Sequence, residues 1–235
     1  MAIRWQEIRK ENFMAYKEKD TKKWTAQWFE TNVRGEKKKR RKRGFETKRE
    51  ALEFERNKKL SYYLMFEILF WTGCRIGELL AITKADINFE KNQLNIDKTY
   101  YRTGKKDVIT EPKTKQSVRI IEIPGFLKKE IQEFVDRHYG MADTQRLFPV
   151  VQEAVQHKMK RQIKVAGVKK IRVHDLRHSH VAYLIEKGVE PLLIKERLGH
   201  KDIRITLNTY GHLYPNQQRK VANLLDEENQ IDAIK

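Results

Sequence analysis

The chain has 235 residues, of which 39% are apolar, and this is enough for one domain with a real core plus a small second unit. A formal net charge of +18 indicates a polyanionic partner, and no run approaches the length of a membrane span or of an apolar signal region. The single cysteine, Cys74, excludes an intrachain disulfide and a cysteine-based metal cluster, so we expect a nucleic-acid-binding protein in a reducing, cytoplasmic setting.

Two segments near the N-terminus, residues 12–18 and 23–31, alternate apolar or aromatic with polar side chains, which predicts two strands. Trp24, Ala26 and Trp28 would share one face. The next segment holds seven consecutive basic residues: Lys37, Lys38, Lys39, Arg40, Arg41, Lys42 and Arg43. It is open to two interpretations. One is a solvated or disordered loop, and the other is a third strand whose outer face follows DNA phosphates.

A helix is expected directly after the basic segment. Thr47 can cap its N-terminus, and Glu50 three residues later completes the spacing of a capping box. Ala51, Leu52 and Phe54 supply an apolar inner face that can pack on the strands.

From residue 60 onward the pattern becomes helical and apolar, with Tyr63, Phe66, Leu69 and Phe70 on one face before a break at Gly73. We expect short strands at residues 93–97, 98–102 and 118–123. Helices are expected at residues 126–138, 151–165 and 174–187, followed by a short helix that begins near Pro191. The predicted fold class is α+β, mostly helical after the N-terminal unit.

Six residues with phosphate-binding or nucleophilic side chains occur over more than half of the chain: Arg75, Lys113, His174, Arg177, His200 and Tyr210. Arg75 lies in a turn that leads into an apolar helical stretch. His174 and Arg177 are three residues apart at the start of a helix, so they share a face and can reach one phosphate. The planar guanidinium of arginine donates two parallel hydrogen bonds and stays charged, which suits the phosphorane formed when a phosphodiester is cleaved.

In the order and local context of these six positions the chain resembles the tyrosine recombinases, the family of phage and conjugative-transposon integrases, over residues 60–215. Residues 42–51 also resemble the arm-type DNA-binding domain of that family, a three-stranded sheet with one helix that enters the major groove. The resemblance implies an AP2-like arm-binding domain at residues 1–55 and a catalytic domain at residues 58–235.

The resemblance also implies site-specific cleavage and rejoining of DNA without metal, other cofactor or ATP. Arg75 and Arg177 would clamp the two non-bridging oxygens of the scissile phosphate. His174 would be the general base, because a histidine with a pKa of about 6.5 can accept a proton from a phenol with a pKa of about 10.

Lys113 resembles the mobile lysine that protonates the leaving 5′-oxygen in the family, and His200 would donate to a non-bridging oxygen. Tyr210 would be the nucleophile that forms a 3′-phosphotyrosyl link, which stores the energy of the phosphodiester for rejoining. Tyr214 is the nearest rival, but its place immediately before Pro215 favours a structural role.

Simpler interpretations apply to other residues near this set. His174 and His178 have the i,i+4 spacing of a metal pair, but the sequence offers no evident third ligand, so we expect no metal. His178, His180 and His212 are expected to pack or to contact phosphate. Glu78 would either orient Arg75 through an ion pair or remain solvated.

Integrases of this type carry a helical core-binding domain between the arm-binding and catalytic domains, and the join at residues 56–59 leaves no room for one. The leading hypothesis is a recombinase with intact catalytic residues but weakened binding at the core site. One alternative is a non-recombining DNA-binding protein that competes with a full-length integrase. The other is a type IB topoisomerase-like nicking and closing activity.

Residues 216–225 form an amphipathic stretch with Val221, Ala222, Leu224 and Leu225 on one face. It could pack on its own domain. By the resemblance it would instead dock on a neighbouring protomer and link the active sites of a tetramer on double-stranded DNA, with accessory DNA-bending proteins as candidate further partners.

Overall fold

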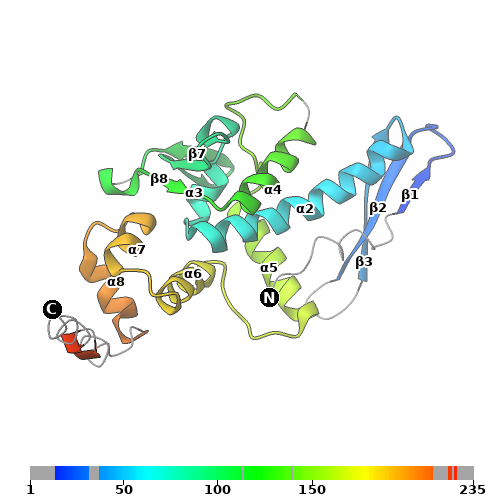
Figure 1. Cartoon of the computed structure of the whole chain (residues 1–235). Coiled ribbons are helices and arrows are strands. Elements are labelled where there is room, and N and C mark those ends of the chain that lie inside the picture. Colours follow the sequence, from blue (N-terminus) through cyan, green and yellow to red (C-terminus); the bar gives the residue numbers. More distant parts are fainter. Residues whose placement is uncertain are drawn as a thin grey trace.

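The computed structural model describes residues 14–31, 37–112, 114–138, 140–213, 222–223 and 225–226. A small N-terminal sheet lies at one end of a long helix, and the other helices and strands gather around the opposite end (Figure 1). None of the described helices is both long and apolar enough to cross a bilayer. Most of the amphipathic stretch predicted at residues 216–225 lies outside the described residues.

The N-terminal sheet is antiparallel, with strand order β1-β2-β3. It consists of β1 (Met14–Lys17), β2 (Trp24–Thr31) and β3 (Lys37–Phe45). The basic segment therefore forms a strand, as the second of the two interpretations expects, while its contact with DNA phosphates stays a prediction. The pairing of β2 with β3 shifts between Trp24 and Ala26, where Gly44 adopts a φ of 95°. This bulge lets Phe45 turn onto α2 and pack against Phe54, with ring centroids 5.4 Å apart.

Helix α2 (Lys48–Thr72) runs without a break from the sheet into the rest of the molecule. Its N-terminus is capped as predicted, because the Thr47 side chain accepts a hydrogen bond from the Glu50 amide at 3.1 Å. The Glu50 carboxylate reaches back to the amide of Glu46, one residue before the expected partner. The predicted boundary between residues 55 and 58 falls inside this helix, so the division into two domains stays a prediction.

The buried face of α2 differs from the predicted one. Leu64, Met65 and Ile68 are fully buried together with Leu69, whereas Tyr63, Phe66 and Phe70 are half-buried. The face is rotated because the aromatic side chains lie at its edge, where Phe70 packs against Tyr183 of the later helix α6 (Asp175–Glu186). Large aromatic rings suit such positions since they are seldom buried completely.

Two small antiparallel sheets follow α3 (Ile76–Ala81). One has the order β4-β5-β8, from β4 (Ile87–Asn88), β5 (Gln93–Ile96) and β8 (Arg119–Glu122). The other is a hairpin of β6 (Thr99–Thr103) and β7 (Lys106–Thr110). The sequence did not predict β4 or β7. β4 has two residues, and four of the five residues of β7 are exposed, so neither gives an alternating pattern.

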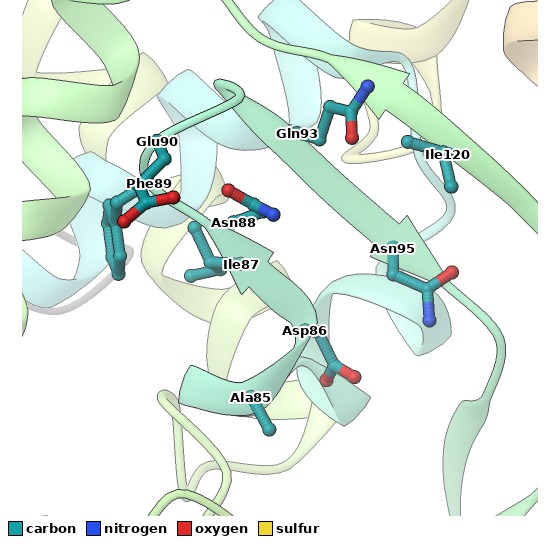
Figure 2. A pocket seen from close by; sticks show the side chains of 9 residues that line it. All are labelled: Ala85, Asp86, Ile87, Asn88, Phe89, Glu90, Gln93, Asn95 and Ile120. Carbon is teal, nitrogen blue, oxygen red and sulfur yellow. The ribbon is translucent and has the colours of Figure 1, made fainter.

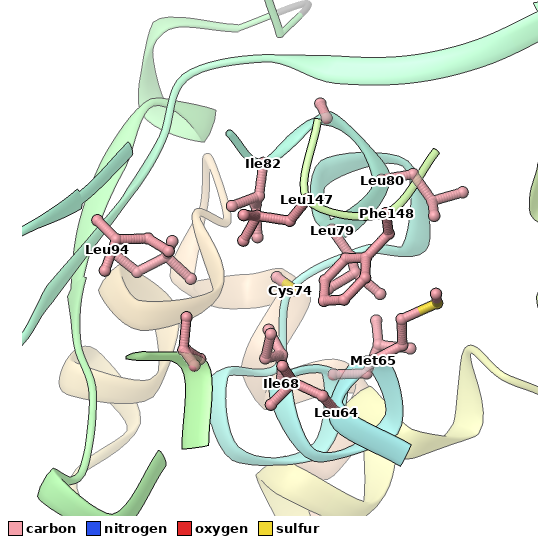
Figure 3. Packing of buried hydrophobic residues seen from close by; sticks show 14 of the residues in the cluster. Leu64, Met65, Ile68, Cys74, Leu79, Leu80, Ile82, Leu94, Leu147 and Phe148 are labelled. Carbon is pink, nitrogen blue, oxygen red and sulfur yellow. The ribbon is translucent and has the colours of Figure 1, made fainter. Parts of the chain in front are cut away.

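Four of the five remaining helices match the predicted positions closely, whereas the fifth, at Ile203–Tyr210, was not predicted. The five are α4 (Gly125–Asp136), α5 (Gln152–Ala166), α6 (Asp175–Glu186), α7 (Pro191–Leu198) and α8 (Ile203–Tyr210), with short 3₁₀ turns at η1 (Lys84–Asp86), η2 (Lys115–Ser117) and η3 (Gly211–Leu213). The main core gathers side chains of α2, α3 and the segment around Phe148 (Figure 3). A second, smaller cluster joins α6, α7 and α8, and it includes Tyr210 beside Val181 and Leu198.

Candidate functional site

Arg75 and Arg177 meet where the C-terminal end of α2 passes close to α6. Gly73 ends α2 with a φ of 67°, and a Cβ atom there would lie 2.6 Å from His180 Cδ2 and 2.9 Å from Leu198 Cδ2. Glycine therefore permits both the left-handed turn and the close approach of the later helices. Arg75 is the N-cap of α3, immediately after this turn, and its side chain is 42% exposed.

Arg177 is buried and holds this junction together. Its guanidinium donates to the carbonyl oxygen of Gly73 at 2.6 Å and to that of Leu198 at 2.8 Å. Burial lowers the pKa of Arg177 to about 10, and the positive charge of Arg75 acts in the same direction. The side chain is still a cation at neutral pH. A cation held in this way is ready to receive an anion, since a phosphate would relieve the repulsion between the two arginines.

Glu78 is the carboxylate that orients Arg75. It is 4% exposed and accepts hydrogen bonds from Arg75, both from the backbone amide and from Nη1, each at 2.8 Å. Arg119 donates to the same carboxylate at 2.9 Å and 3.2 Å and is itself buried. Burial alone would raise the pKa of Glu78, but the contacts with Arg119 and Arg75 together lower it below the ordinary value of 4.5. Of the two interpretations of Glu78, the structure therefore supports the ion pair.

Replacing Glu78 with glutamine is expected to lower the free energy of unfolding by about 3 kcal/mol at neutral pH, because it leaves buried Arg119 without its countercharge. The folded pKa of Glu78 is depressed, so its contribution is present above the unfolded pKa near 4.5 and is lost as the pH falls through the lower folded value. Urea unfolding of both proteins across this range should show the difference shrinking in acid. The matched control is Glu133→Gln, whose side chain is 45% exposed and which should change stability by less than about 0.5 kcal/mol. A difference between Glu78→Gln and the wild type that stays constant in acid would contradict this role.

His200 and His174 lie in the field of the same arginines. His200 Nδ1 is 2.9 Å from the Thr206 hydroxyl. Burial, followed by the charges of Arg177, Arg75 and Arg119, lowers the pKa of His200 to about 4. Burial also lowers the pKa of His174, with smaller effects from His178 and the neighbouring arginines. Both imidazoles are therefore neutral at physiological pH, and each can donate one hydrogen bond without adding charge.

Tyr210 ends α8 with its side chain buried against α6. Its hydroxyl lies 2.6 Å from Nδ1 of His178. Burial raises the pKa of the phenol, and the charge of Arg177 lowers it to a smaller extent. Electrostatic interactions thus connect Arg177 with four of the other predicted residues, namely Arg75, His174, His200 and Tyr210. The sixth predicted residue, Lys113, lies outside the described residues, as does Tyr214.

Several residues of this network were not predicted. Arg119 lies at the start of β8, and strand alternation places it on the same face as buried Ile121. The alternation of this strand could therefore have predicted an inward-facing arginine. Arg197 donates to Nε2 of His180 at 3.1 Å and to the carbonyl oxygen of Trp71 at 2.8 Å. Burial and Arg197 lower the pKa of His180 to about 3, so this histidine is a neutral packing residue, as expected. The inward position of Arg197 could not be predicted in this way, because Arg197 lies on a helix and cations on helices mostly face solvent.

The basic strand β3 presents cations on both faces of the N-terminal sheet. The described side chains Lys39, Arg41, Lys42 and Arg43 are exposed. Arg43 pairs with Glu18 at 2.8 Å, and the ammonium of Lys42 lies 4.5 Å from the centroid of the Phe54 ring on α2. Both cations are thus tied to neighbouring elements. Lys39 and Arg41 alternate on the face opposite Lys42 and are both exposed, so we select them to test phosphate binding.

Replacing Lys39 and Arg41 together with glutamine is expected to weaken DNA binding and to reduce the salt dependence of the affinity. Each lost phosphate contact lowers the slope of log K against log salt by about 0.9, so the double variant should lose about 2. Fluorescence anisotropy with labelled duplex DNA at several salt concentrations measures this slope. The control replaces Lys91 and Lys129 with glutamine. Both lysines are distant from β3 in the chain, and their replacement removes the same amount of positive charge. An equal loss of slope in the control would show a general charge effect and contradict a specific role for β3.

A shallow pocket lies on the β4-β5-β8 sheet (Figure 2). Its lining includes Asn88, Gln93, Asn95 and Ile120, and Ile120 is 63% exposed. The Asp86 carboxylate at its edge is already engaged by Thr83 and Lys98. None of the five predicted catalytic residues that the structure describes lines this pocket, so the arginine and histidine set forms a separate site. Within the described ranges, no three His, Cys, Asp or Glu side chains gather as metal ligands would.

Two family models match the chain. The model of the phage integrase family matches residues 45–217, and the model of the arm DNA-binding domain matches residues 14–62. The matched regions overlap along the first part of α2. The ICEBs1 integrase of Bacillus subtilis (strain 168) is 35% identical over 181 residues, which are 72% of this chain and 49% of that relative. A XerC-like tyrosine recombinase of Caldanaerobacter subterraneus is 30% identical over 205 residues, or 76% of this chain and 51% of the relative. The chain thus spans about half the length of these curated relatives.

Solved structures agree with these matches. The Tn1549 transposon integrase in complex with circular intermediate DNA is 25% identical, with a TM-score of 0.60 over 71% of this chain and 59% of that chain. The XerA recombinase is 19% identical, with a TM-score of 0.52 over 73% of this chain and 57% of the other, and this likeness shows the fold alone.

Proposed function

The chain belongs to the phage integrase family of tyrosine recombinases, and we propose that it cleaves and rejoins DNA at a specific site through a 3′-phosphotyrosyl link at Tyr210. The observation that carries this proposal is the convergence of four other predicted residues, Arg75, His174, His200 and Tyr210, on the buried guanidinium of Arg177. They come from the α2–α3 junction, α6, the end of α7 and α8, which are far apart in the sequence. A junction that gathers two arginines, two neutral histidines and a phenol suits metal-free phosphoryl transfer.

Each residue has a role that its surroundings support. Arg75 and Arg177 bind the non-bridging oxygens, because both are cations with few compensating charges beyond Glu78. His174 and His200 donate to the same phosphate as neutral imidazoles. Lys113 is the proposed acid for the leaving 5′-oxygen. No metal, other cofactor or ATP enters this scheme, since the tyrosyl ester keeps the energy of the broken bond.

We propose that the partner is double-stranded DNA bound at two places, with the N-terminal sheet on arm-type sites and the arginine set on the cleaved strand. The arm DNA-binding match over β1–β3 and the exposed cations of β3 support the first contact. By analogy with the family, complete strand exchange takes four protomers on two duplexes, linked through their C-terminal segments. Accessory DNA-bending proteins are candidate further partners of that assembly.

A second function, that of a DNA-binding competitor without recombination, is favoured by one observation. The arm and integrase matches overlap within α2, so α2 leads directly from the sheet into the catalytic residues. A clamp that closes around DNA with a separate core-binding domain would need additional chain between them. Loss of those contacts would weaken binding at the cleaved site while leaving the arm sheet intact.

Covalent capture on a DNA pool separates the two functions. The pool consists of nicked duplexes with a randomised central sequence, so that the short strand released by cleavage diffuses away and traps the protein. Cleavage activity predicts a protein–DNA adduct that survives a denaturing gel, and sequencing the trapped DNA would reveal the preferred site. Binding to the pool at low salt without any such adduct would favour the competitor.

A further inference from the structure

The hydroxyl of the proposed nucleophile lies against a histidine that is not among the six predicted residues. Nδ1 of His178 and Oη of Tyr210 are 2.6 Å apart, and the ring centroids are 5.6 Å apart. We propose that His178 is the general base that removes the phenol proton when Tyr210 attacks DNA. This inference rests on the proposed function, because it assigns a role within the same cleavage reaction.

Tyr210 needs a base in the position it occupies. Its ring is buried in the small cluster between α6, α7 and α8, beside Val181 and Leu198. Burial raises the pKa of the phenol more than Arg177 lowers it. The phenol therefore keeps its proton at neutral pH, and only the phenolate is a strong nucleophile. The hydrogen bond to His178 places a proton acceptor at transfer distance before DNA arrives.

The described neighbours of His178 are an acidic residue, a second histidine and the phenol of Tyr210. Asp175, one turn earlier on α6, interacts electrostatically with His178. His174 packs edge-on against it, with ring centroids 5.0 Å apart and planes at 87°. Burial lowers the pKa of His174, so this neighbour stays neutral and does not oppose a positive charge on His178. From α8 the facing group is Tyr210 itself, which becomes an ester as His178 becomes a cation.

We assign different roles to His178 and His174. The phenol of Tyr210 is hydrogen-bonded to Nδ1 of His178, whereas the charges acting on His174 besides His178 are those of Arg177, Arg172 and Arg75. His174 is accordingly placed with the phosphate-binding arginines. The sequence favoured His174 as base because an imidazole can accept a proton from a phenol, but His178 carries the same imidazole, and the spacing of His174 from Arg177 suits a shared phosphate.

The proposed step balances in both directions. During cleavage the Oη–H bond of Tyr210 breaks, an Nδ1–H bond forms on His178, and Oη bonds to phosphorus. The P–O5′ bond breaks, and the leaving oxygen takes a proton from the acid proposed at Lys113. On rejoining, the 5′-hydroxyl gives its proton back to Lys113 as its oxygen attacks phosphorus, the Oη–P bond breaks and His178 returns the proton to Tyr210. The resting His178 must therefore carry its hydrogen on Nε2.

The test compares His178→Asn with the wild type in single-turnover cleavage of the sequence recovered from the pool, over a range of pH. Asparagine keeps an oxygen near the position of Nδ1 that can accept a hydrogen bond, but it cannot accept a proton. We expect the rate at neutral pH to fall about 100- to 10,000-fold. The remaining rate should rise about tenfold per pH unit, because hydroxide must now ionise the phenol, while the wild type levels off. A misfolded variant would show no such rise.

Two control variants sharpen the comparison. His157→Asn, on an exposed position of α5, should match the wild type, and His174→Asn should cleave slowly without the rise with pH. Wild-type or faster cleavage by His178→Asn would show that His178 only holds the tyrosine, and the proposal would be wrong. The same holds if the rise with pH appears in His174→Asn instead. If the wild type itself forms no adduct, it is the proposed function that fails.

Discussion

Replacing Tyr210 with phenylalanine is expected to abolish the covalent protein–DNA adduct while DNA binding persists. The substitution removes the one atom that is proposed to bond to phosphorus, and no other group can form the same ester from that position. The ring would keep its place between α6 and α8, and the lost hydrogen bond to His178 should cost about 1 kcal/mol of stability. Adduct formation on the nicked pool, read on a denaturing gel, measures the effect.

The neighbouring tyrosine supplies the matched control. Tyr214→Phe removes the same hydroxyl four residues later and should leave the adduct unchanged. Gel-shift binding and thermal unfolding of both variants show whether each is folded and still reaches DNA. Persistence of the adduct in Tyr210→Phe, or its disappearance in Tyr214→Phe alone, would overturn the assignment of the nucleophile.

Replacing Arg177 with lysine is expected to lower the cleavage rate by about 100- to 1,000-fold, although the charge is retained. Arg177 uses Nη1 for the carbonyl of Gly73 and Nη2 for that of Leu198, and a single ammonium cannot reproduce this fork. One buried carbonyl would lose its donor, which costs about 1–3 kcal/mol of stability. Single-turnover kinetics with a saturating concentration of protein separates the loss of rate from weaker binding.

The same substitution at an exposed arginine tests whether the effect belongs to the site. Arg137 follows α4, and its side chain is 37% exposed, so Arg137→Lys should change the rate by less than about twofold. If Arg177→Lys retained the wild-type rate, the buried guanidinium would be a structural tie between α2, α6 and α7 and not part of the phosphate clamp.

Much of the fold could be predicted from the sequence, because its helices carry strong local signals. Thr47 caps α2 as its spacing with Glu50 indicates, and Gly199 ends α7 in a left-handed turn with a φ of 67°. The continuity of α2 could not be predicted in the same way. The apolar residues before and after residue 60 follow separate patterns, because α2 packs on the N-terminal sheet and also on α4 and α6. That these patterns belong to one unbroken helix is visible only in the structure.

The site was predicted in composition but not in its internal contacts. Arg75 and Arg177 were identifiable as phosphate-binding types, yet their dependence on Glu78 and Arg119 is a property of the packed structure. Likewise, the sequence places His174 and His178 on one helix face but cannot tell which of them meets the phenol. That choice depends on how α8 returns against α6, a contact between segments 32 positions apart.

The central claim is a phosphodiester between DNA and Tyr210, and mass spectrometry of the trapped adduct tests it most directly. After nuclease and trypsin digestion, the peptide of residues 205–219 contains both Tyr210 and Tyr214, and fragmentation locates the nucleotide on one of them. We expect a phosphonucleotide on Tyr210. A nucleotide on Tyr214, or on a residue outside this peptide, would contradict the proposed chemistry of the site.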